Sequence, residues 1–292
     1  MAVKLKRMTE RREFLGGMIG AGVALAAGEW HSAARGGSLR VGLELYSLRK
    51  ELDRDVPGAL ALARRMGFTQ VEVAMLHGLS AHEFAAALKA AGLKATSLAA
   101  AHEDLQAKLD LVKQRAEEFL AKWVVLAWIP HSGDFTVEMA KRVAREMSEW
   151  GESLGKNGIR LAYHPHGYEF RPEANGSAFD VLLKETNPKT VFFEVDTFWA
   201  EVAGQNCAQL IARLGSRVRL LHLKDLRRGA QTGVFTGAAA DEDSVALGDG
   251  VIDWRGVLAA ARKAGVERYF IEDESPAVEK QVPKSLEFLA AL

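Results

Sequence analysis

The chain has 292 residues, of which 48% are hydrophobic and 26% charged, the balance of an ordinary globular protein. Basic and acidic residues both number 38, so the chain has no net positive charge to attract nucleic acid or anionic lipid. The single cysteine, Cys207, excludes an intrachain disulfide and a cysteine-built zinc site. We therefore expect no nucleic-acid partner, and either one large domain or two small ones.

The first 34 residues have the pattern of an export signal. Arg11 and Arg12 form a twin-arginine pair, and an uncharged run rich in glycine and alanine follows over residues 16–28. This run is too short and too weakly apolar for a convincing membrane span. Small residues at Ser32-Ala33-Ala34 match the spacing that signal peptidase reads, with Ala24-Leu25-Ala26 as a second choice.

Residues 1–34 therefore resemble a Tat signal peptide that is cleaved. This resemblance implies the Tat export machinery as a partner and a periplasmic or exported mature protein. It also implies no stable membrane insertion after cleavage. The alternative is an amphipathic N-terminus without a targeting role.

From about residue 40, short apolar runs alternate with segments of helical period. The predicted strands cover residues 40–46, 70–74, 94–99, 123–128, 158–164, 190–196, 218–222 and 268–272. The predicted helices cover residues 55–66, 81–91, 104–120, 136–154, 177–185, 206–214, 252–264 and 276–292. Residues 227–250 form the one long irregular stretch.

Eight strands, each followed by a helix, predict an α/β fold: a (β/α)₈ TIM barrel that forms a single domain over residues 35–292. An open doubly wound sheet is the alternative. It is disfavoured because no Gly-x-Gly-x-x-Gly turn follows the first strand.

Functional residues of such a barrel lie at the carboxyl ends of its strands, and polar side chains gather there in this sequence. Those at or just after a strand end include Glu44, Glu72, His102, His164, His166, Glu169, Glu194, Asp196, His222, Lys224, Glu272 and Glu274. Carboxylates and imidazoles this close to a core are costly unless they are paired or bound to a metal. A single such residue would be a hydrogen-bonded structural group, but several strands in succession favour a shared site.

The stretch Leu161–Phe170 is the densest of these strand ends. His164 and His166 are two residues apart, so an extended strand points both to the same face. Glu169 follows a glycine, where the backbone can turn the carboxylate back towards them. Imidazoles and a carboxylate in one place indicate a metal or acid–base site.

The strand ends together offer a mixed set of metal ligands: His164, Asp196, His222 and Glu272. Two imidazoles and two carboxylates suit Mn²⁺ or Zn²⁺ first, with Co²⁺, Fe²⁺ and Mg²⁺ as alternatives.

Five stretches of the sequence resemble the xylose isomerase-like barrel superfamily, the sugar phosphate isomerase/epimerase group. They are Gly42–Arg49, Tyr163–Phe170, Glu194–Trp199, His222–Asp225 and Gly248–Trp254, and they occur in the right order over nearly all of the mature chain. The fifth-strand pattern His-x-His-x-x-Glu-Phe resembles an exported branch of that group in particular.

The resemblance implies a divalent metal held at the ends of the last four barrel strands, with Asp196, His222 and Glu272 as ligands. His164 stands where many relatives have glutamate, so either His164 binds the metal or Glu169 reaches in. Trp199 stands where many epimerases have histidine, and a tryptophan there suits the wall of a sugar site.

Such a site supports proton abstraction next to a carbonyl, so we expect a metal-dependent isomerase or epimerase with a carbohydrate substrate. Catalytic roles fall to Glu169 or Glu272 as acid/base and Lys224 as the oxyanion stabiliser, and substrate-binding roles to His102, His166, Trp199 and Glu44. The alternatives are a keto-sugar dehydratase or lyase, a non-catalytic sugar-binding barrel and, less favoured, a nuclease related to apurinic endonucleases.

Overall fold

The structure is a computed structural model that describes residues 39–174 and 176–292. The Tat-type signal of residues 1–34 lies outside the described residues and stays a prediction. Within the described ranges, no helix combines the length and the apolar character that a membrane crossing requires.

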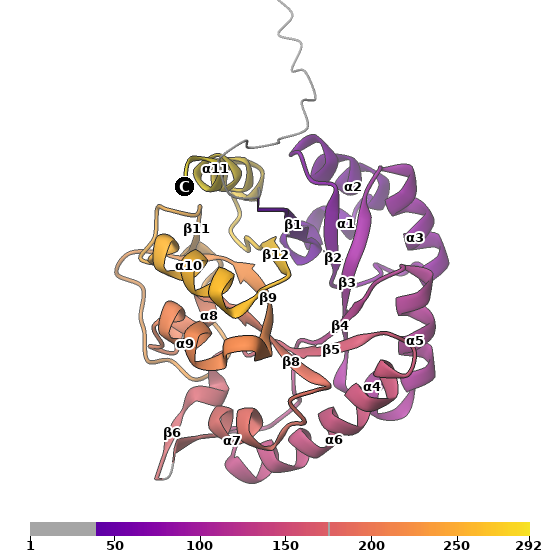
Figure 1. Cartoon of the computed structure of the whole chain (residues 1–292). Helices are drawn as coiled ribbons and strands as arrows, with labels where there is room; N and C mark the ends of the chain where they lie inside the picture. The colour runs from indigo at the N-terminus through magenta and orange to yellow at the C-terminus, as the bar shows by residue number, and fades with distance from the viewer. Residues whose placement is uncertain (1–38, 175) are drawn as a thin grey trace, which may run out of the picture. The chain divides into compact units, whose positions relative to one another are not determined.

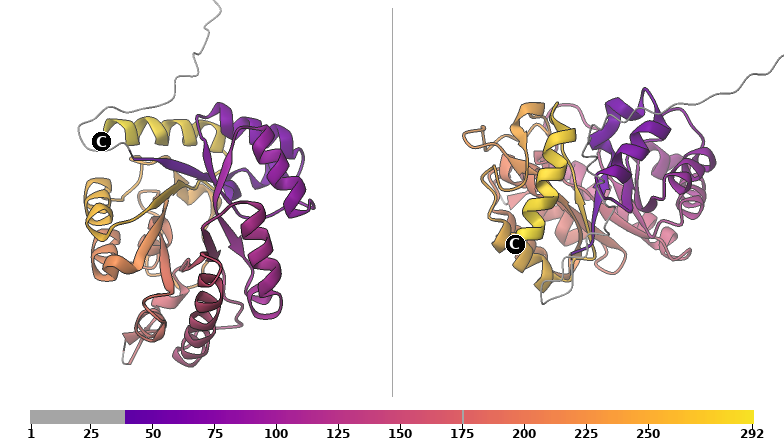
Figure 2. Two further views of the ribbon diagram at one scale, coloured as in Figure 1. Left: turned by 45° about the vertical axis from the view of Figure 1, so that its right-hand side comes forward. Right: turned by 90° about the horizontal axis from the view of Figure 1, so that it is seen from above.

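Eight parallel strands close into a barrel, with helices on its outer side (Figures 1 and 2). Around the ring the strands are β1 (Val41–Glu44), β12 (Arg268–Ile271), β9 (Val218–Leu223), β8 (Val191–Asp196), β5 (Arg160–Tyr163), β4 (Trp123–Leu126), β3 (Lys94–Ala100) and β2 (Gln70–Val73). All eight correspond to predicted strands, so the predicted single-domain (β/α)₈ barrel is confirmed.

The helices follow the prediction with two differences. They are α1 (Arg49–Leu52), α2 (Val56–Arg65), α3 (Ala81–Ala90), α4 (His102–Ala107), α5 (Leu109–Glu118), α6 (Val137–Gly155), α7 (Ala178–Glu185), α8 (Thr197–Val202), α9 (Cys207–Leu214), α10 (Trp254–Ala264) and α11 (Val278–Ala291). The helix expected over 104–120 is two helices, because the backbone of Lys108 leaves the helical region. Helices α1 and α8 were not predicted as separate elements.

Short strands outside the barrel organise its loops. They are β6 (Pro172–Glu173) paired with β7 (Gly176–Ser177), and β10 (Asp225–Leu226) paired with β11 (Ser244–Val245). The second pair closes the base of the irregular stretch predicted at 227–250. That stretch is therefore a loop anchored at both of its ends.

Asp225 is the anchor of that loop. Its fully buried carboxylate accepts hydrogen bonds from the backbone amides of Gly248, Gly250 and Ile252 and from the indole Nε1 of Trp254. A Cβ at Gly250 would lie 2.1 Å from Asp225 Oδ1, so only glycine fits there. The motif Gly248–Trp254 is thus explained by one buried carboxylate.

The inside of the barrel has two layers. Trp123, Val125, Ala162, Leu220 and Phe270 form a buried apolar cluster, against which Phe192 packs. Side chains two residues further along a strand point to the same face. The inward positions that follow this apolar layer are therefore His164 just after β5, Glu194 and Asp196 on β8, His222 on β9 and Glu272 just after β12. The apolar layer is the floor of a polar chamber at the carboxyl end.

Candidate metal centre

Asp196, His222 and Glu272 come together above the apolar floor, as the ends of three neighbouring strands. One ligand atom from each lies within 4.8 Å of those of the other two, and all three side chains are buried. The sequence analysis placed these residues in one ligand set, and the structure brings them into one group.

Asp196 is fixed by the helix that follows it. It is the N-cap of α8, and its Oδ1 accepts hydrogen bonds from the amides of Phe198 at 2.7 Å and Trp199 at 3.0 Å. Its Oδ2 is buried and has no hydrogen-bond partner. This free oxygen lies 3.8 Å from His222 Nδ1 and 4.0 Å from His164 Nε2. Capping therefore aims one oxygen at two imidazoles.

The two nitrogens of His222 face two different groups of carboxylates. Nδ1 lies 2.8 Å from Glu272 Oε2, on the side of Asp196. Nε2 lies 2.9 Å from Glu72 Oε1 and 3.3 Å from Glu194 Oε2. A neutral imidazole carries one proton, so when Nε2–H donates to the deeper carboxylates, Nδ1 is left with a lone pair facing Asp196 and Glu272.

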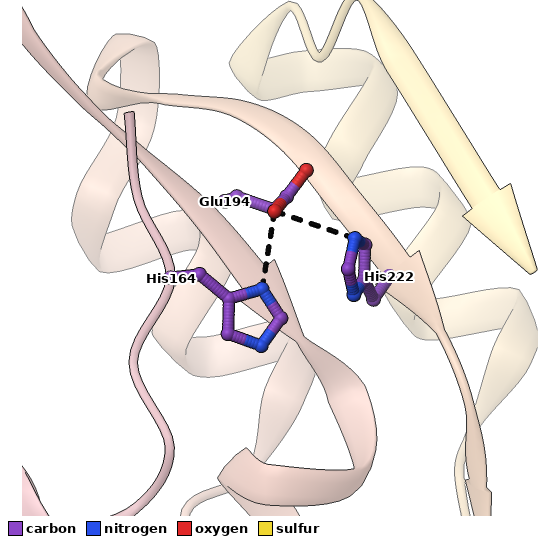
Figure 3. A group of neighbouring side chains, drawn as sticks. All are labelled: His164, Glu194 and His222. Carbon is purple, nitrogen blue, oxygen red and sulfur yellow. Dashed lines mark hydrogen bonds and ion pairs between the residues drawn. The ribbon is translucent and has the colours of Figure 1, made fainter. Parts of the chain in front are cut away.

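Glu194 contacts both imidazoles (Figure 3). Its Oε2 lies 3.1 Å from His164 Nδ1 and 3.3 Å from His222 Nε2, and the side chain has no exposed surface. These contacts fix both rings so that His164 Nε2 and His222 Nδ1 are free to face Asp196. A carboxylate behind a metal-binding imidazole orients the ring and raises its basicity.

The residues present therefore fit a divalent cation. The orphaned Asp196 Oδ2, the lone pair of His222 Nδ1, a Glu272 oxygen and His164 Nε2 form a mixed nitrogen and oxygen donor set. Such a set is typical of Zn²⁺ and Mn²⁺ sites. Two other groups also have the spacing of ligands, one of His164, Glu194 and His222 and one of Glu44, Glu72 and His222.

The charges of the group are strongly perturbed by burial and by one another. Burial raises the pKa of Asp196 to about 7. Burial acts in the same direction on Glu272, but Lys224 and His222 outweigh it and hold the pKa of Glu272 well below its ordinary value. Burial and the neighbouring His222 lower the pKa of His164. The chamber thus keeps Glu272 ionised and His164 neutral, the protonation states in which both can bind a metal. Burial lowers the pKa of His222, but Glu194, Glu272 and Glu72 outweigh it and raise the pKa well above its ordinary value, so a metal that binds Nδ1 displaces a proton.

Lys224 brings a positive charge to the edge of the group. Its ammonium, in a side chain only 1% exposed, forms an ion pair with Glu274 and lies 3.5 Å from Glu272 Oε1. It also lies over the rings of Phe198 and Trp199, 4.7 and 5.2 Å from their centroids. A small cavity beside the ammonium is lined by Phe198, Trp199, Asp241, Ser244 and Glu274.

His166 and Trp199 lie on the open side of the group. The His166 ring is 4.6 Å from the His164 ring and 5.5 Å from the Trp199 ring, measured between centroids. His166 Nδ1 lies 3.3 Å from the carbonyl oxygen of His164. Trp128, which is 40% exposed, is 5.3 Å from His166. Aromatic faces of this kind suit the apolar face of a sugar ring.

Glu169 lies away from the ligand group. Gly167 has a φ of 95°, and after this turn the Glu169 carboxylate has no exposed surface. It accepts hydrogen bonds from the hydroxyl of Tyr163 and from the amide of His166, the latter at 3.1 Å. Glu169 therefore stabilises the turn that carries the two histidines. Of the residues at this strand end, His164 is the one that belongs to a group with the spacing of metal ligands.

Glu169 should make the protein less stable as the pH rises. Burial raises its pKa from 4.5 to about 7. The folded state therefore favours the protonated carboxyl, and this contribution is present below pH 4.5 and is lost as the pH rises through 7. Relative to Glu169→Gln, the free energy of unfolding of the wild type should fall by about 3 kcal/mol between pH 4 and pH 8.

Urea unfolding of both proteins at the two pH values measures this difference. The comparison with Glu169→Gln cancels the other groups that titrate in the same range. An identical pH dependence in the two proteins would show that Glu169 is ionised in the fold.

His102 is not brought to the ligand group. It is the first residue of α4, which turns it away from the barrel end towards α6. Its Nε2 lies 3.2 Å from Glu146 Oε2, and its ring packs edge-on against Trp150 at 5.2 Å. Glu44 does lie inside the barrel, 4% exposed, and its ligand atom groups with those of Glu72 and His222.

Glu72 and Glu194 are the central residues that the predicted ligand set leaves out. The signal for Glu194 was its position two residues before Asp196, which gives both the same face of β8. Glu72 is on β2, far from His222 in sequence, so only the closure of the barrel brings the two side chains to 2.9 Å.

Comparison with known proteins gives the family. Residues 60–292 match the family described as xylose isomerase-like TIM barrel. The chain belongs to the xylose isomerase-like TIM barrel family. The predicted resemblance is therefore confirmed at the level of the family.

Curated relatives and solved structures that are similar to this chain have more specific names. The inosose dehydratase of Geobacillus thermodenitrificans is 27% identical over 164 residues, which cover 49% of this chain and 50% of that protein. The chain thus spans about half the length of the curated relatives that it matches. A sugar phosphate isomerase/epimerase from Parabacteroides distasonis has the same fold, with a TM-score of 0.72, 22% identity and coverage of 90% of this chain and 98% of that one.

A second solved structure of this fold holds a metal. It is the IOLI protein with a bound zinc atom, with a TM-score of 0.65, 16% identity and coverage of 87% of this chain and 97% of that one. At such identity the likeness shows the fold alone. For this xylose isomerase-like barrel, the evidence for a cation site is its own set of buried donors.

Proposed function

We propose that this protein is a divalent-metal-dependent enzyme that acts on a keto-sugar or a related cyclic keto-polyol as a dehydratase. Its first step is removal of a proton next to the carbonyl, and its second is loss of water from the neighbouring carbon. The observation that carries the proposal is the free Asp196 Oδ2 facing His164 and His222, with the Lys224 ammonium at the edge of the same group.

Three further findings support this proposal. The chain belongs to a family of barrels that resemble xylose isomerase. Half of it matches proteins named inosose dehydratase, and a neighbour in fold holds zinc. When bound, a divalent cation supplies Lewis-acid stabilisation of the negative charge that develops on a carbonyl oxygen as an adjacent proton leaves.

His166 is the residue that we assign to proton removal. When its Nδ1–H donates to the carbonyl oxygen of His164, 3.3 Å away, Nε2 is left with the free lone pair. Burial lowers the pKa of His166 to about 4, so the ring is neutral near pH 7 and able to accept a proton. The ring lies between those of His164 and Trp199, on the open side of the group. The C–H bond next to the carbonyl breaks, its proton passes to Nε2, and its electron pair stays on the substrate.

Lys224 is the residue that we assign to charge stabilisation and to the leaving hydroxyl. Its ammonium, beside the cavity lined by Trp199 and Glu274, can hydrogen-bond to an oxygen of the substrate. When the C–O bond of the neighbouring hydroxyl breaks, that oxygen takes a proton from Lys224 and leaves as water. Trp199 supplies an apolar wall. The oxygens of Glu272 bind the cation and pair with Lys224, so Glu272 has no role in proton transfer.

Solvent deuterium tests the proposal. The zinc- or manganese-loaded protein is incubated in D₂O with inososes and keto-sugars, and products are followed by mass spectrometry and NMR. We expect loss of 18 mass units and an unsaturated or dicarbonyl product from at least one compound. A product that has lost no water but carries deuterium on the carbon next to the carbonyl would instead identify an isomerase or epimerase. No exchange and no elimination with any of the compounds would contradict both activities and favour a sugar-binding barrel.

A further inference from the structure

The loop that joins β10 to β11, residues 227–243, has two fixed ends and a loosely packed middle. We call this loop the strap. None of its residues is buried, and it contains no α-helix and no strand. Its ends are held by the pairing of β10 with β11 and by the carboxylate of Asp225. Segments with few buried contacts open locally at low free-energy cost, so the strap is suited to movement about fixed ends.

One part of the strap lies against the side chains that follow β4 and β5. Trp128 follows β4 and Tyr168 follows β5. A Cβ at Gly237 would lie 2.9 Å from the ring of Trp128 and 3.0 Å from that of Tyr168, so the glycine packs directly on both rings. Nearby, the amide of Val234 donates a hydrogen bond of 3.0 Å to the carbonyl oxygen of Val202, at the end of α8.

Asp241 connects the strap to the other side of the barrel. Its Oδ2 lies 3.3 Å from Nη2 of Arg49, which begins α1 after β1, and β1 is opposite β5 in the ring of strands. The Arg49 side chain is 14% exposed. It also donates to the carbonyl oxygens of Tyr46 at 3.1 Å and of Glu274 at 3.4 Å. Arg49 therefore joins the strap to the ends of β1 and β12.

The strap also forms part of the wall of the small cavity beside Lys224. Strap residues 239–241 line this cavity together with Trp199 and Glu274. Its volume is about 20 Å³, which is room for about one water molecule. Ligand pockets normally measure about 300–1,000 Å³. A keto-sugar therefore cannot enter beside Lys224 unless a wall of the cavity moves.

We propose that the strap opens to admit the substrate and closes over it, and that Arg49 is the positioning residue that holds it closed. Arg49 is neither in the ligand group nor among the residues that line the cavity, so it acts through Asp241 and Glu274. Closure keeps water away from Lys224 while the substrate reacts. The movement of the strap does not depend on which reaction the centre catalyses, but its effect on turnover rests on the proposed function.

Arg49 and Lys50 contact the same oxygen of Asp241 and differ in burial. Each lies 3.3 Å from Oδ2, but the Lys50 side chain is 54% exposed and that of Arg49 is 14% exposed. Water screens an exposed pair, whereas a partly buried hydrogen bond between charged groups contributes more to stability. Arg49 should therefore set the balance between the open and closed strap, and Lys50 should not.

Hydrogen exchange of single amides, followed by NMR in the protein with zinc added, tests the strap. We expect the amide of Val234, in the strap, to be protected at least about a hundredfold less than that of Ile252, which Asp225 holds at the fixed end. Arg49→Met and Asp241→Ala should each lower the protection of Val234 by a further factor of about ten and leave that of Ile252 unchanged.

Two further variants separate this result from general destabilisation. Lys50→Met should leave the protection of Val234 within about threefold of the wild type. Gly237→Val places a side chain against the aromatic rings on the other side, so it should lower the protection of Val234 as Arg49→Met does. Thermal melting shows whether each variant folds. Equal protection of Val234 and Ile252 in the wild type, or unchanged protection of Val234 in folded Arg49→Met and Gly237→Val, would overturn the strap.

Steady-state kinetics with a substrate from the D₂O screen test the role of Arg49 in the reaction. Arg49→Met should lower kcat about tenfold and change KM less than about threefold, because closure acts after the substrate is bound. An unchanged kcat would overturn the positioning role of Arg49. Absence of turnover in the wild type would count against the proposed function alone, because the exchange result stands without it.

Discussion

His222→Ala should abolish binding of the cation at the candidate metal centre and reduce activity by at least about a thousandfold. The imidazole contacts a carboxylate through each of its nitrogens, Glu272 through Nδ1 and Glu72 through Nε2. Without it the cation loses a ligand, and several kcal/mol of charge stabilisation correspond to about three powers of ten in rate. Zinc content by elemental analysis and turnover of the substrate found in the D₂O screen measure the two effects.

A graded comparison sharpens this prediction. Glu194→Gln leaves all four ligands of the candidate metal centre in place. It weakens only the hydrogen bonds that orient the rings of His164 and His222, so the affinity for the cation should fall by about 10- to 100-fold. His82→Ala removes an exposed histidine that is also paired with a carboxylate, and it should change neither zinc content nor activity. Full zinc occupancy in His222→Ala would show that His222 is not a ligand.

Lys224→Met should lower activity by about 100- to 1,000-fold while zinc stays bound. The ammonium is the only lysine or arginine charge that the described residues place against Glu272, and the assigned reaction needs it at the oxyanion and at the leaving hydroxyl. The variant should also lose roughly 3–5 kcal/mol of stability, because one partner of a buried ion pair is removed and Glu274 is left behind. Steady-state kinetics and urea unfolding measure these effects.

Lys50→Met is the matched control for Lys224→Met. Lys50 also forms an ion pair, with Asp241, but its side chain is 54% exposed, and such pairs contribute roughly 0–1 kcal/mol. We expect near wild-type activity and stability. If Lys224→Met keeps full activity, Lys224 has a structural role alone, and the leaving hydroxyl must be protonated by another group.

Most of the barrel was predictable from the sequence because apolar runs alternate with helical segments over the whole described chain. The predicted strand at 190–196 is β8 to within one residue, since its apolar run ends at a polar strand end. The predicted single helix at 104–120 is two helices, and the break at Lys108 carries no proline or glycine to mark it. The short strands β10 and β11 pair across a loop and have no apolar run of their own.

The sequence predicted which face of a strand each site residue occupies, but not which side chains it contacts. Counting by two along a strand places Glu194 on the same face as Asp196, yet it does not show that Glu194 reaches two imidazoles. The contact between Glu72 and His222 depends on strands that are far apart in sequence. Glu169 shows the opposite case, because the turn at Gly167 directs a residue of the strongest motif into the protein rather than into the chamber.

Anomalous X-ray scattering from crystals of the zinc-loaded protein tests the central claim most directly. We predict a peak at the zinc edge with His222 Nδ1, Asp196 Oδ2, Glu272 and His164 Nε2 as ligands, at about 2.0–2.2 Å. A peak between His164 and Glu194 that leaves Asp196 Oδ2 free would contradict the candidate metal centre. The absence of any peak within the barrel would contradict it as well.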